Sequence, residues 1–436
     1  MKLKTIAMAA LGAAVGVSAV VSTAPAMADQ FIPGTVYRSG PYAPGGIPFA
    51  DGYGDYIKLV NAAGGVNGVK IQYEECDTGY NTAKGVECYE KLKGKGPTGA
   101  AVFQPLSTGI TYAITEKATA DKIPVHSMGY GRAAATIGST FPYVFTFPVT
   151  YWAGADAIVQ YMTAQEGGSL KGKKVALVYH DSAYGKEPIS TLKAHAAKAG
   201  FKLSLHPVSH PGLEQKATWL TIGRKIRPDY VVMWGWGVMN STAIKEAKAV
   251  RFPMEKFIGV WWSGNEIDVR PAGKAAIGYK AAQFTSPGEF PVIKKARALY
   301  ADGKGTAKNT TDVGTMIYNR GVAAAFFAVE AIKTAQAKFG NKEMTGEQMQ
   351  VGFETLEITQ AKIDAAGFKG MITPFNVSCN NHEGDGQVRI FQWDGKKWNP
   401  TSEWLTPDRG MLRPMYQAAA DKYAKEKGIT PRADCK

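Results

Sequence analysis

The sequence contains few of the residues from which catalytic and metal sites are most often built. Of its 436 residues, only four are Cys and six are His. No Cys-x-x-Cys pair occurs, and Pro207 separates the two closest His, His206 and His210, which keeps them off one helical face. A thioredoxin-like redox site and a zinc site are therefore both unfavoured. We expect neither a metal nor a cofactor.

The motifs of common enzyme classes are absent or incomplete. Neither G-x-S-x-G nor H-E-x-x-H occurs. Residues 167–173 fit G-x-x-x-x-G-K, but Lys174 stands where a phosphate loop has Ser or Thr. Residues 129–134 fit G-x-G-x-x-A, yet no acid follows at the distance at which a dinucleotide-binding fold holds a ribose. We expect a protein that is not an enzyme, the alternative being a hydrolase assembled from residues distant in sequence.

No apolar run beyond the N-terminal segment is long enough to span a bilayer. The N-terminal segment has the order of a secretory signal: Lys2 and Lys4, an Ala-rich apolar run, and the small-residue pattern of residues 26–28. We expect residues 1–28 to be a cleaved signal peptide. Because Asp29 rather than Cys follows, we expect no lipid anchor and a periplasmic protein.

The formal net charge of +14 raises the question of an anionic partner. The basic residues are scattered through Lys-rich turns such as 91–96, 171–174 and 394–398, which is typical of a solvated surface. Export also argues against nucleic acid, so we expect no nucleic-acid partner.

All four cysteines lie after the signal segment, and in an oxidising compartment an even number of cysteines is expected to pair. Three pairings are possible. We favour Cys76 with Cys88 and Cys379 with Cys435, because the organisation of the chain described below can bring both pairs together.

Strand-length apolar runs alternate with helical segments along the chain, which predicts parallel sheets in an α/β fold. Pro148 interrupts this series, and a second series follows it, so we expect two doubly wound lobes. The strand-length runs are 69–75, 99–105, 122–128, 175–181, 230–236 and 257–262, and the helical candidates cover about 50–63, 80–93, 108–120, 152–165, 185–199, 239–250 and 312–336.

Ligands of open α/β sheets bind beyond the carboxyl ends of the strands, where helix N-termini offer free N–H groups. The loops expected at this edge are 39–47, 104–109, 128–132, 181–185, 235–240 and 261–265. They are rich in aromatic residues, for which packing on the sheet is the alternative role. These residues are Tyr42, Tyr130, Tyr184, Trp236, Trp261 and Trp262.

From about residue 34 to 400 the chain resembles the periplasmic solute-binding proteins of ABC transporters of the branched-chain amino acid (Leu/Ile/Val) type. The resemblance rests on the order of several short segments. These are SGPYAPGGIPFADG (39–52), NAAGGVNG (61–68), YEECDTGYN (73–81), HDSAYGKE (180–187), MWGWGVMN (233–240), FIGVWWSGN (257–265) and VRIFQWDGKKW (388–398).

The resemblance implies a type I periplasmic binding fold, with two lobes joined by a three-segment hinge. Lobe 1 would comprise residues 29–148 and 285–384, and lobe 2 residues 149–284 and 385–436. It further implies that a monomer traps a small-molecule ligand between the lobes and delivers it to an inner-membrane ABC permease. A sensory protein that signals through a receptor would share every one of these features.

The same resemblance implies roles for individual residues. Ser107 and Thr108 match the positions that hold a ligand carboxylate, although either hydroxyl can equally be a helix N-cap. Tyr130, with Arg132 as a further candidate, falls in the second ligand loop of lobe 1. Tyr184 matches the aromatic residue that closes over the ligand from lobe 2. Further candidates are Tyr42 and Trp236, the latter in a second lobe-2 aromatic loop.

The sequence departs from the family pattern at one position. Trp261 stands where branched-chain amino acid binders carry an acid that pairs with the ligand ammonium, unless Glu266 takes over that role. Burying an ammonium without a counter-charge is costly. The departure therefore argues against an α-amino acid. It favours an aromatic or flat carboxylate, or a small amide, although a branched-chain amino acid-like carboxylate stays an alternative.

Overall fold

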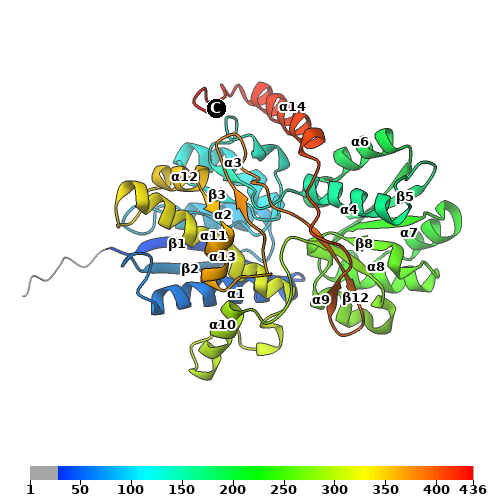
Figure 1. The fold of residues 1–436 in the computed structure, drawn as a ribbon, viewed down its shortest axis with the longest axis horizontal. Coiled ribbons are helices and arrows are strands. Elements are labelled where there is room, and N and C mark those ends of the chain that lie inside the picture. The colour runs from blue at the N-terminus through cyan, green and yellow to red at the C-terminus, as the bar shows by residue number, and fades with distance from the viewer. Residues whose placement is uncertain (1–27, 436) are drawn as a thin grey trace, which may run out of the picture.

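The computed structural model describes residues 28–435, so the predicted signal peptide lies outside the described residues except for residue 28. The chain forms two α/β lobes side by side (Figure 1). The blue, cyan and gold segments make the first lobe, and the green segments make the second. The predicted fold class, two parallel-sheet lobes, is confirmed.

The sheet of the first lobe is parallel and built from short strands. β1 (Gln30–Val36) pairs with β2 (Ile71–Asp77), and β3 (Val125–His126) pairs with β4 (Val144–Phe145). Parallel bridges at Gln104 and Phe103 connect β1 to β3. The strand predicted at 99–105 is thus reduced to these two bridges, which nevertheless join the sheet.

Helices cover this sheet, and two of them pack through glycines. In α1 (Ala43–Ala62), a Cβ on Gly52 would lie 2.2 Å from the carbonyl oxygen of Tyr318; in α11 (Met316–Phe339), one on Gly321 would lie 2.0 Å from that of Phe49. The two backbones therefore touch where side chains would separate them. The other elements are α2 (Thr82–Leu92), α3 (Thr108–Asp121), η1 (Ala133–Thr136), α10 (Pro291–Ala301), η6 (Thr310–Asp312), α12 (Gly346–Glu354), β10 (Glu357–Ile358), α13 (Gln360–Ala366) and β11 (Phe375–Asn376).

The second lobe is built on a seven-stranded sheet of order β13-β12-β9-β8-β7-β5-β6. Strands β5 to β9 are parallel, while β12 and β13 form an antiparallel edge. The strands are β5 (Lys174–His180), β6 (Lys202–Val208), β7 (Tyr230–Trp234), β8 (Phe257–Gly259), β9 (Lys280–Gln283), β12 (Arg389–Trp393) and β13 (Trp398–Pro400). The helices are α4 (Tyr151–Gln165), α5 (Ala183–Lys186), α6 (Ile189–Ala199), α7 (Lys216–Leu220), η2 (Thr221–Ile226), α8 (Val238–Ala249), η3 (Met254–Lys256), η4 (Trp261–Ser263), α9 (Glu266–Val269) and η5 (Arg270–Ala276).

Some helices and strands differ from those predicted from the sequence, and the residues in them explain why. The predicted helix 185–199 is two helices, because Pro188 breaks the backbone hydrogen-bonding pattern between α5 and α6. Several strands had not been expected, β1 and β6 among them. β1 contains Pro33 and Gly34, which are typical of turns, and β6 is an edge strand that is mostly half-buried.

The chain passes from one lobe to the other between β4 and β5, between β9 and β10, and between β11 and β12 (Figure 1). The first and third connections run in contact: Thr150 donates from its N and Oγ1 to Glu383 Oε1, at 3.0 and 2.8 Å. A Cβ on Gly386 would lie 2.1 Å from the carbonyl oxygen of Pro148. The lobe boundaries derived from the sequence stay a prediction.

The C-terminal helix α14 (Arg409–Lys427) touches both lobes. Tyr416 stacks on Trp152 of α4 at 5.2 Å, while Tyr423 stacks on Phe141 of the first lobe at 4.8 Å. Figure 1 shows α14 in red above both lobes. The sequence assigned residues 385–436 to the second lobe as a block, which does not describe these contacts with the first.

Both predicted disulfides are present. Cys76 pairs with Cys88 and joins β2 to α2, with Cα atoms 5.8 Å apart. Cys379 pairs with Cys435 and ties the tail to the segment after β11, with Cα atoms 5.2 Å apart. The second bridge holds the end of the chain against the first lobe.

Removing either bridge should lower the free energy of unfolding, and the cost should follow the length of the closed loop, 12 residues for Cys76–Cys88 and 56 for Cys379–Cys435. Chain entropy gives about 3 kcal/mol for the short loop and about 4 kcal/mol for the long one. Urea unfolding of the two double Cys→Ser variants measures this. A larger loss for the short loop would contradict the expectation.

Candidate functional site

Aromatic side chains from both lobes meet where the lobes face each other. We call this set the interlobe aromatic cluster. Apart from half-buried Tyr80, each member is at most 3 % exposed. The first lobe supplies Tyr37, Tyr42, Tyr80 and Tyr130, and the second supplies Tyr151, Tyr184, Trp236, Trp261 and Trp262.

The parallel sheets bring these residues together because their strands end at the same edge. Tyr37 follows β1, and Tyr42 is the N-cap residue of α1. Trp236 follows β7, Trp261 begins η4 after β8, and Tyr184 lies in α5 after β5. The loops predicted from the sequence to hold a ligand therefore converge in space.

Trp236 carries much of the contact across the lobes. Its ring is parallel to that of Tyr42, with centroids 6.4 Å apart and an interplanar angle of 14°. It is edge-on to Tyr37 at 6.1 Å and to Trp262 at 5.4 Å. Such geometries are favourable for aromatic pairs. Its Nε1 is buried and finds no hydrogen-bond partner within residues 28–435.

Trp262 lies between a phenol and a guanidinium. Tyr130 stacks on it at 4.4 Å, and the Arg320 guanidinium lies 4.5 Å from its ring centroid. Arg320 is fully buried on α11 and donates from Nη2 to Gln283 Oε1 at 2.7 Å. Burial lowers the pKa of Arg320 to about 10, so the side chain keeps its positive charge at neutral pH. Such a cation–π stack is strongest where water is excluded.

Trp261 forms a hydrogen bond from the second lobe to the first. Its Nε1 and that of Trp262 both donate to the carbonyl oxygen of Gly129, at 2.8 and 2.5 Å. The Trp261 ring stacks on Tyr151 at 5.4 Å, with an interplanar angle of 11°. Gly129 has φ +69°, and a Cβ there would lie 3.0 Å from Trp261 Nε1, so this close approach requires glycine.

Glu266 is engaged elsewhere in the structure. Its Oε2 accepts a hydrogen bond of 3.0 Å from the backbone N of Met316, the first residue of α11. A carboxylate at a helix N-terminus is favourable, although burial raises the pKa of Glu266 to about 7. This contact does not support Glu266 as the replacement for the family's ammonium partner.

Ser107 and Thr108 form the N-terminus of α3. Ser107 is the N-cap residue and accepts a hydrogen bond from the N of Ile110, at 3.4 Å. Thr108 Oγ1 accepts from the N of Gly131, at 3.1 Å. Within residues 28–435, the N–H groups of Thr108 and Gly109 donate to no protein acceptor. Capping is therefore present, and two N–H groups stay available for an anion.

The remaining predicted residues divide between the cluster and another part of the molecule. The hydroxyl of Tyr130 lies 3.3 Å from that of Tyr37, and the hydroxyl of Tyr184 donates to the Gly235 carbonyl at 2.8 Å. Arg132 lies instead over the rings of Tyr112 and Tyr423, at 4.6 and 4.2 Å. It is thus placed beside α14, outside the cluster.

The hydroxyl of Tyr42 connects two histidines of the second lobe. It lies 2.9 Å from His180 Nε2 and also contacts His210 Nδ1. His180 Nδ1 in turn contacts Ser182 Oγ, at 2.8 Å. Burial, with a smaller contribution from the charge of His210, lowers the pKa of His180 to about 4, against the weak opposite effect of Asp181.

Some members of the site gave weak signals in the sequence. Tyr37 was missed because β1 had not been expected, and Tyr80 and Tyr151 lay outside the loops selected. Arg320 lies in the middle of a long Ala-rich helix, where a basic residue is normally exposed. A charged residue inside an otherwise apolar helical stretch was the one available signal.

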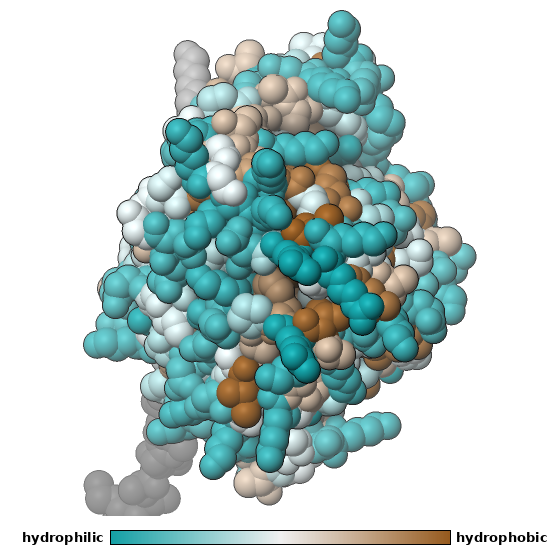
Figure 2. All heavy atoms as spheres, turned by 90° about the vertical axis from the view of Figure 1, so that its right-hand side faces the viewer, coloured by the Kyte–Doolittle hydropathy of each residue, from teal (hydrophilic) through white to brown (hydrophobic). Residues whose placement is uncertain are grey.

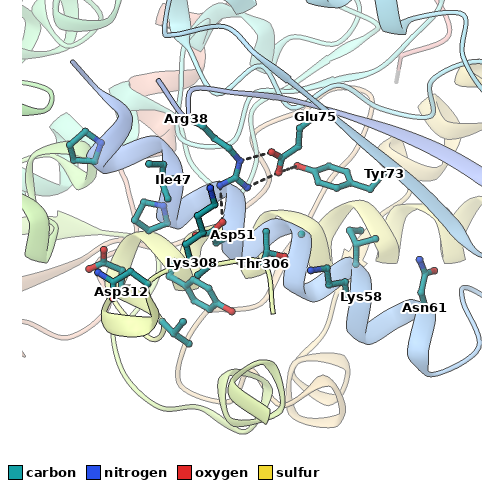
Figure 3. Close-up of a pocket in the computed structure, with 18 of the residues that line it drawn as sticks. Arg38, Ile47, Asp51, Lys58, Asn61, Tyr73, Glu75, Thr306, Lys308 and Asp312 are labelled. Carbon is teal, nitrogen blue, oxygen red and sulfur yellow. Dashed lines mark hydrogen bonds and ion pairs between the residues drawn. The ribbon is translucent and has the colours of Figure 1, made fainter. Parts of the chain in front are cut away.

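The largest cavity described lies elsewhere, on the first lobe. It has a volume of about 930 Å³ and separates α1 from the 306–313 loop (Figure 3). Arg38 is its most prominent polar residue and pairs with Asp51 and Glu75 (Figure 3). Because its main charges compensate one another within the wall, this cavity shows no preference for a charged ligand.

Comparison with known proteins is consistent with this geometry. A profile described as "Periplasmic binding protein" matches residues 30–397. The chain belongs to the periplasmic binding protein family. None of the curated proteins matches this binding protein.

Many solved structures resemble this binding protein. One described as an ABC transporter permease from the Pseudomonas fluorescens group is 41% identical, with TM-score 0.87, covering 93% of this chain and 99% of that chain. A branched-chain amino acid ABC transporter protein from Thermus thermophilus with bound valine is 22% identical, with TM-score 0.73, covering 88% and 99%. A solute-binding protein from R. palustris in complex with benzoate is 18% identical, with TM-score 0.65, covering 87% and 97%.

The relatives of this binding protein are substrate-binding proteins of ABC transporters, not enzymes. Within residues 28–435, no helix combines the length and apolar character needed to cross a bilayer. The face of the second lobe turned to the viewer in Figure 2 is mostly hydrophilic, with small apolar spots. This agrees with the interpretation of the scattered lysines as a solvated surface.

Acid should loosen the contact between the lobes. His180 has a pKa of about 4 in this structure against 6.5 when unperturbed, so its neutral form is favoured here. As the pH falls from about 6.5 towards 4, His180 is protonated in the separated or unfolded form but not in this structure. The free energy of unfolding therefore falls by up to about 1.4 kcal/mol per pH unit.

Thermal unfolding between pH 4.5 and 7.5 tests this expectation, with His180→Gln as the matched variant, since glutamine is polar but does not titrate. The variant should lose less stability on acidification than the unmodified protein. Burial also lowers the pKa of His126, to about 3, but this histidine reduces stability in acid by the same amount in both proteins. Identical acid sensitivity of the two proteins would contradict the role of His180.

Proposed function

We propose that this binding protein traps a small carboxylate with a flat or branched apolar body between its lobes and delivers it to the permease of an ABC importer. The observation that supports this most directly is the interlobe aromatic cluster. Neither lobe can desolvate a ligand alone, and the cluster joins their facing edges. Hinge closure around a bound solute is the standard use of such an arrangement.

Three features favour a carboxylate as the polar end of the solute. The N-terminus of α3 offers the N–H groups of Thr108 and Gly109. Trp236 Nε1 is a buried donor that has no acceptor within the described residues. Arg320 adds a buried positive charge behind Trp262.

The rings of the interlobe aromatic cluster indicate the shape of the apolar end of the solute. Tyr and Trp faces suit an aromatic or branched body, and solved relatives hold valine in one case and benzoate in another. Trp261 occupies the position where the family's amino acid binders have an acid, and it donates a hydrogen bond to the carbonyl oxygen of Gly129. We therefore favour an aromatic carboxylate over an α-amino acid, which would bury an unpaired ammonium.

The same proposal includes the setting of the protein. We propose a periplasmic monomer without a lipid anchor, released by cleavage of residues 1–28. Residues 29–148 and 285–384 would move as lobe 1 against residues 149–284. In this assignment, α14 of the 385–436 segment links the two bodies. Loss of solute uptake on deletion of the gene would distinguish import from sensing.

A thermal-shift screen tests the class of solute. Branched-chain amino acids, benzoate-like aromatic acids and small amides such as urea are compared at equal concentration. At 100 times its Kd a solute stabilises the protein by about 2.7 kcal/mol. We expect a shift with an aromatic carboxylate. A shift with a small amide alone, or with amino acids alone, would contradict the proposed class.

Substitution of Tyr184 tests the cluster as the site. Tyr184→Ala removes a ring at the interlobe face and should weaken binding of the solute found in the screen by about 10- to 100-fold, the loss expected for a buried aromatic contact. Tyr184→Phe keeps the ring and loses only the hydrogen bond to Gly235, so it should bind nearly as well. Unchanged calorimetric affinity of Tyr184→Ala would remove this residue from the site.

A further inference from the structure

A second cavity lies beside α14, away from the interlobe aromatic cluster. It has a volume of about 710 Å³. Three parts of the chain line it: the first lobe with Tyr112 and Arg132, the second lobe with Trp152 and Lys193, and α14 with Tyr423. Figure 1 shows α14 crossing above the region between α3 and α6. A space of this size holds a small organic molecule.

Arg132 is the polar centre of this cavity. Three aromatic rings surround its guanidinium, those of Tyr112, Phe141 and Tyr423, at 4.6, 5.4 and 4.2 Å. Within residues 28–435 it forms no ion pair with a carboxylate. The rings hold the guanidinium in place, and its charge acts through space on the buried carboxyl of Glu187.

The other charges of the wall leave an excess of positive charge. Glu187 is buried, and its carboxyl accepts a hydrogen bond from the Tyr112 hydroxyl. Burial raises the pKa of Glu187 to about 7, which weakens its negative charge at neutral pH. Lys422 pairs with Glu426 at 3.8 Å, whereas exposed Lys193 forms no ion pair within residues 28–435. Glu187 therefore compensates Arg132 only in part, and the wall as a whole keeps an excess of positive charge, to which Arg132 and Lys193 contribute.

Apart from Lys186, which pairs with Asp181, and Ser190, the rest of the wall is apolar. Ala133 and Ala134 lie beside Arg132, and Trp152 and Ile189 come from the second lobe. A ligand that satisfies this wall has one negative group and a compact apolar body.

We propose that this cavity is a second binding site, specific for small organic anions with an aromatic or branched body. Both lobes and α14 contribute to its wall, so the site is complete only when the lobes are together. A ligand that binds one of two conformations more tightly shifts the population towards it. An occupant would therefore favour the closed form and, by linkage, the interlobe contact. This inference does not depend on which solute the interlobe cluster takes.

The fluorescent anion 8-anilinonaphthalene-1-sulfonate is a suitable probe, because it combines a sulfonate with aromatic rings. Titration of the full-length mature protein should give saturable fluorescence. Lys193→Glu reverses an exposed charge on the wall and should weaken binding about 3- to 10-fold. Arg132→Gln should weaken it about tenfold or more. Because Lys193 is exposed, its variant is expected to fold even where Arg132→Gln does not.

A control variant locates the probe. Lys308→Glu reverses an exposed charge on the first-lobe cavity. It should bind the probe as the unmodified protein does. If Lys193→Glu binds unchanged, or if Lys308→Glu weakens binding equally, the proposed site is overturned.

A fourth variant tests the coupling to closure. Tyr42 does not line this cavity, but its hydroxyl joins the lobes through His180 and His210. Tyr42→Ala should weaken probe binding severalfold, because fewer molecules have the lobes together. Unchanged binding by this variant would overturn the dependence on closure, while leaving Lys193→Glu as the test of the site.

Discussion

One carbonyl group lies at the centre of the contact between the two lobes. The oxygen of Gly129, in the first lobe, accepts hydrogen bonds from the indole N–H groups of both Trp261 and Trp262, in the second. A buried donor without an acceptor costs about 1–3 kcal/mol, so separating the lobes exposes two such groups to water or leaves them unpaired. Glycine is favoured at the acceptor because its φ is +69° and a Cβ there would lie 2.9 Å from Phe284 and 3.0 Å from Trp261 Nε1.

Around this contact, aromatic rings pack against buried or half-buried arginine side chains. Arg320 is held by the face of Trp262 and by the side-chain oxygen of Gln283. Arg132 is held by rings in the same way, at the other end of the interlobe region. In both places aromatic rings orient a guanidinium that forms no direct ion pair within residues 28–435, although buried carboxyl groups lie near it: Glu266 and Asp268 for Arg320, and Glu187 for Arg132. This leaves positive potential at two sites between the lobes, and both suit anions with apolar bodies.

The elements that the sequence predicted well are those with a strong periodic signal. The helices at 108–120, 152–165 and 239–250 correspond closely to α3, α4 and α8, since propensity and apolar spacing agree there. β1 was missed because Pro33 and Gly34 are unfavourable in most strands, and burial of its side chains on both faces outweighs that preference. The site loops were predicted because strand-to-helix turns lie at one edge of a parallel sheet.

The residues alone were sufficient for the α/β class and most of the aromatic residues that meet between the lobes, because periodicity and turn chemistry are local properties. For the cysteines they left three pairings open, and the structure contains the favoured one. The chain order could not show that Arg132 faces α14, that Glu266 caps α11, or that Arg320 lies beneath Trp262. Each of these contacts joins segments distant in sequence, and their side chains have several possible partners of suitable chemistry. Packing of the lobes and of the C-terminal helix selects among those partners, because a buried charge needs a ring, dipole or hydrogen-bond partner close to it.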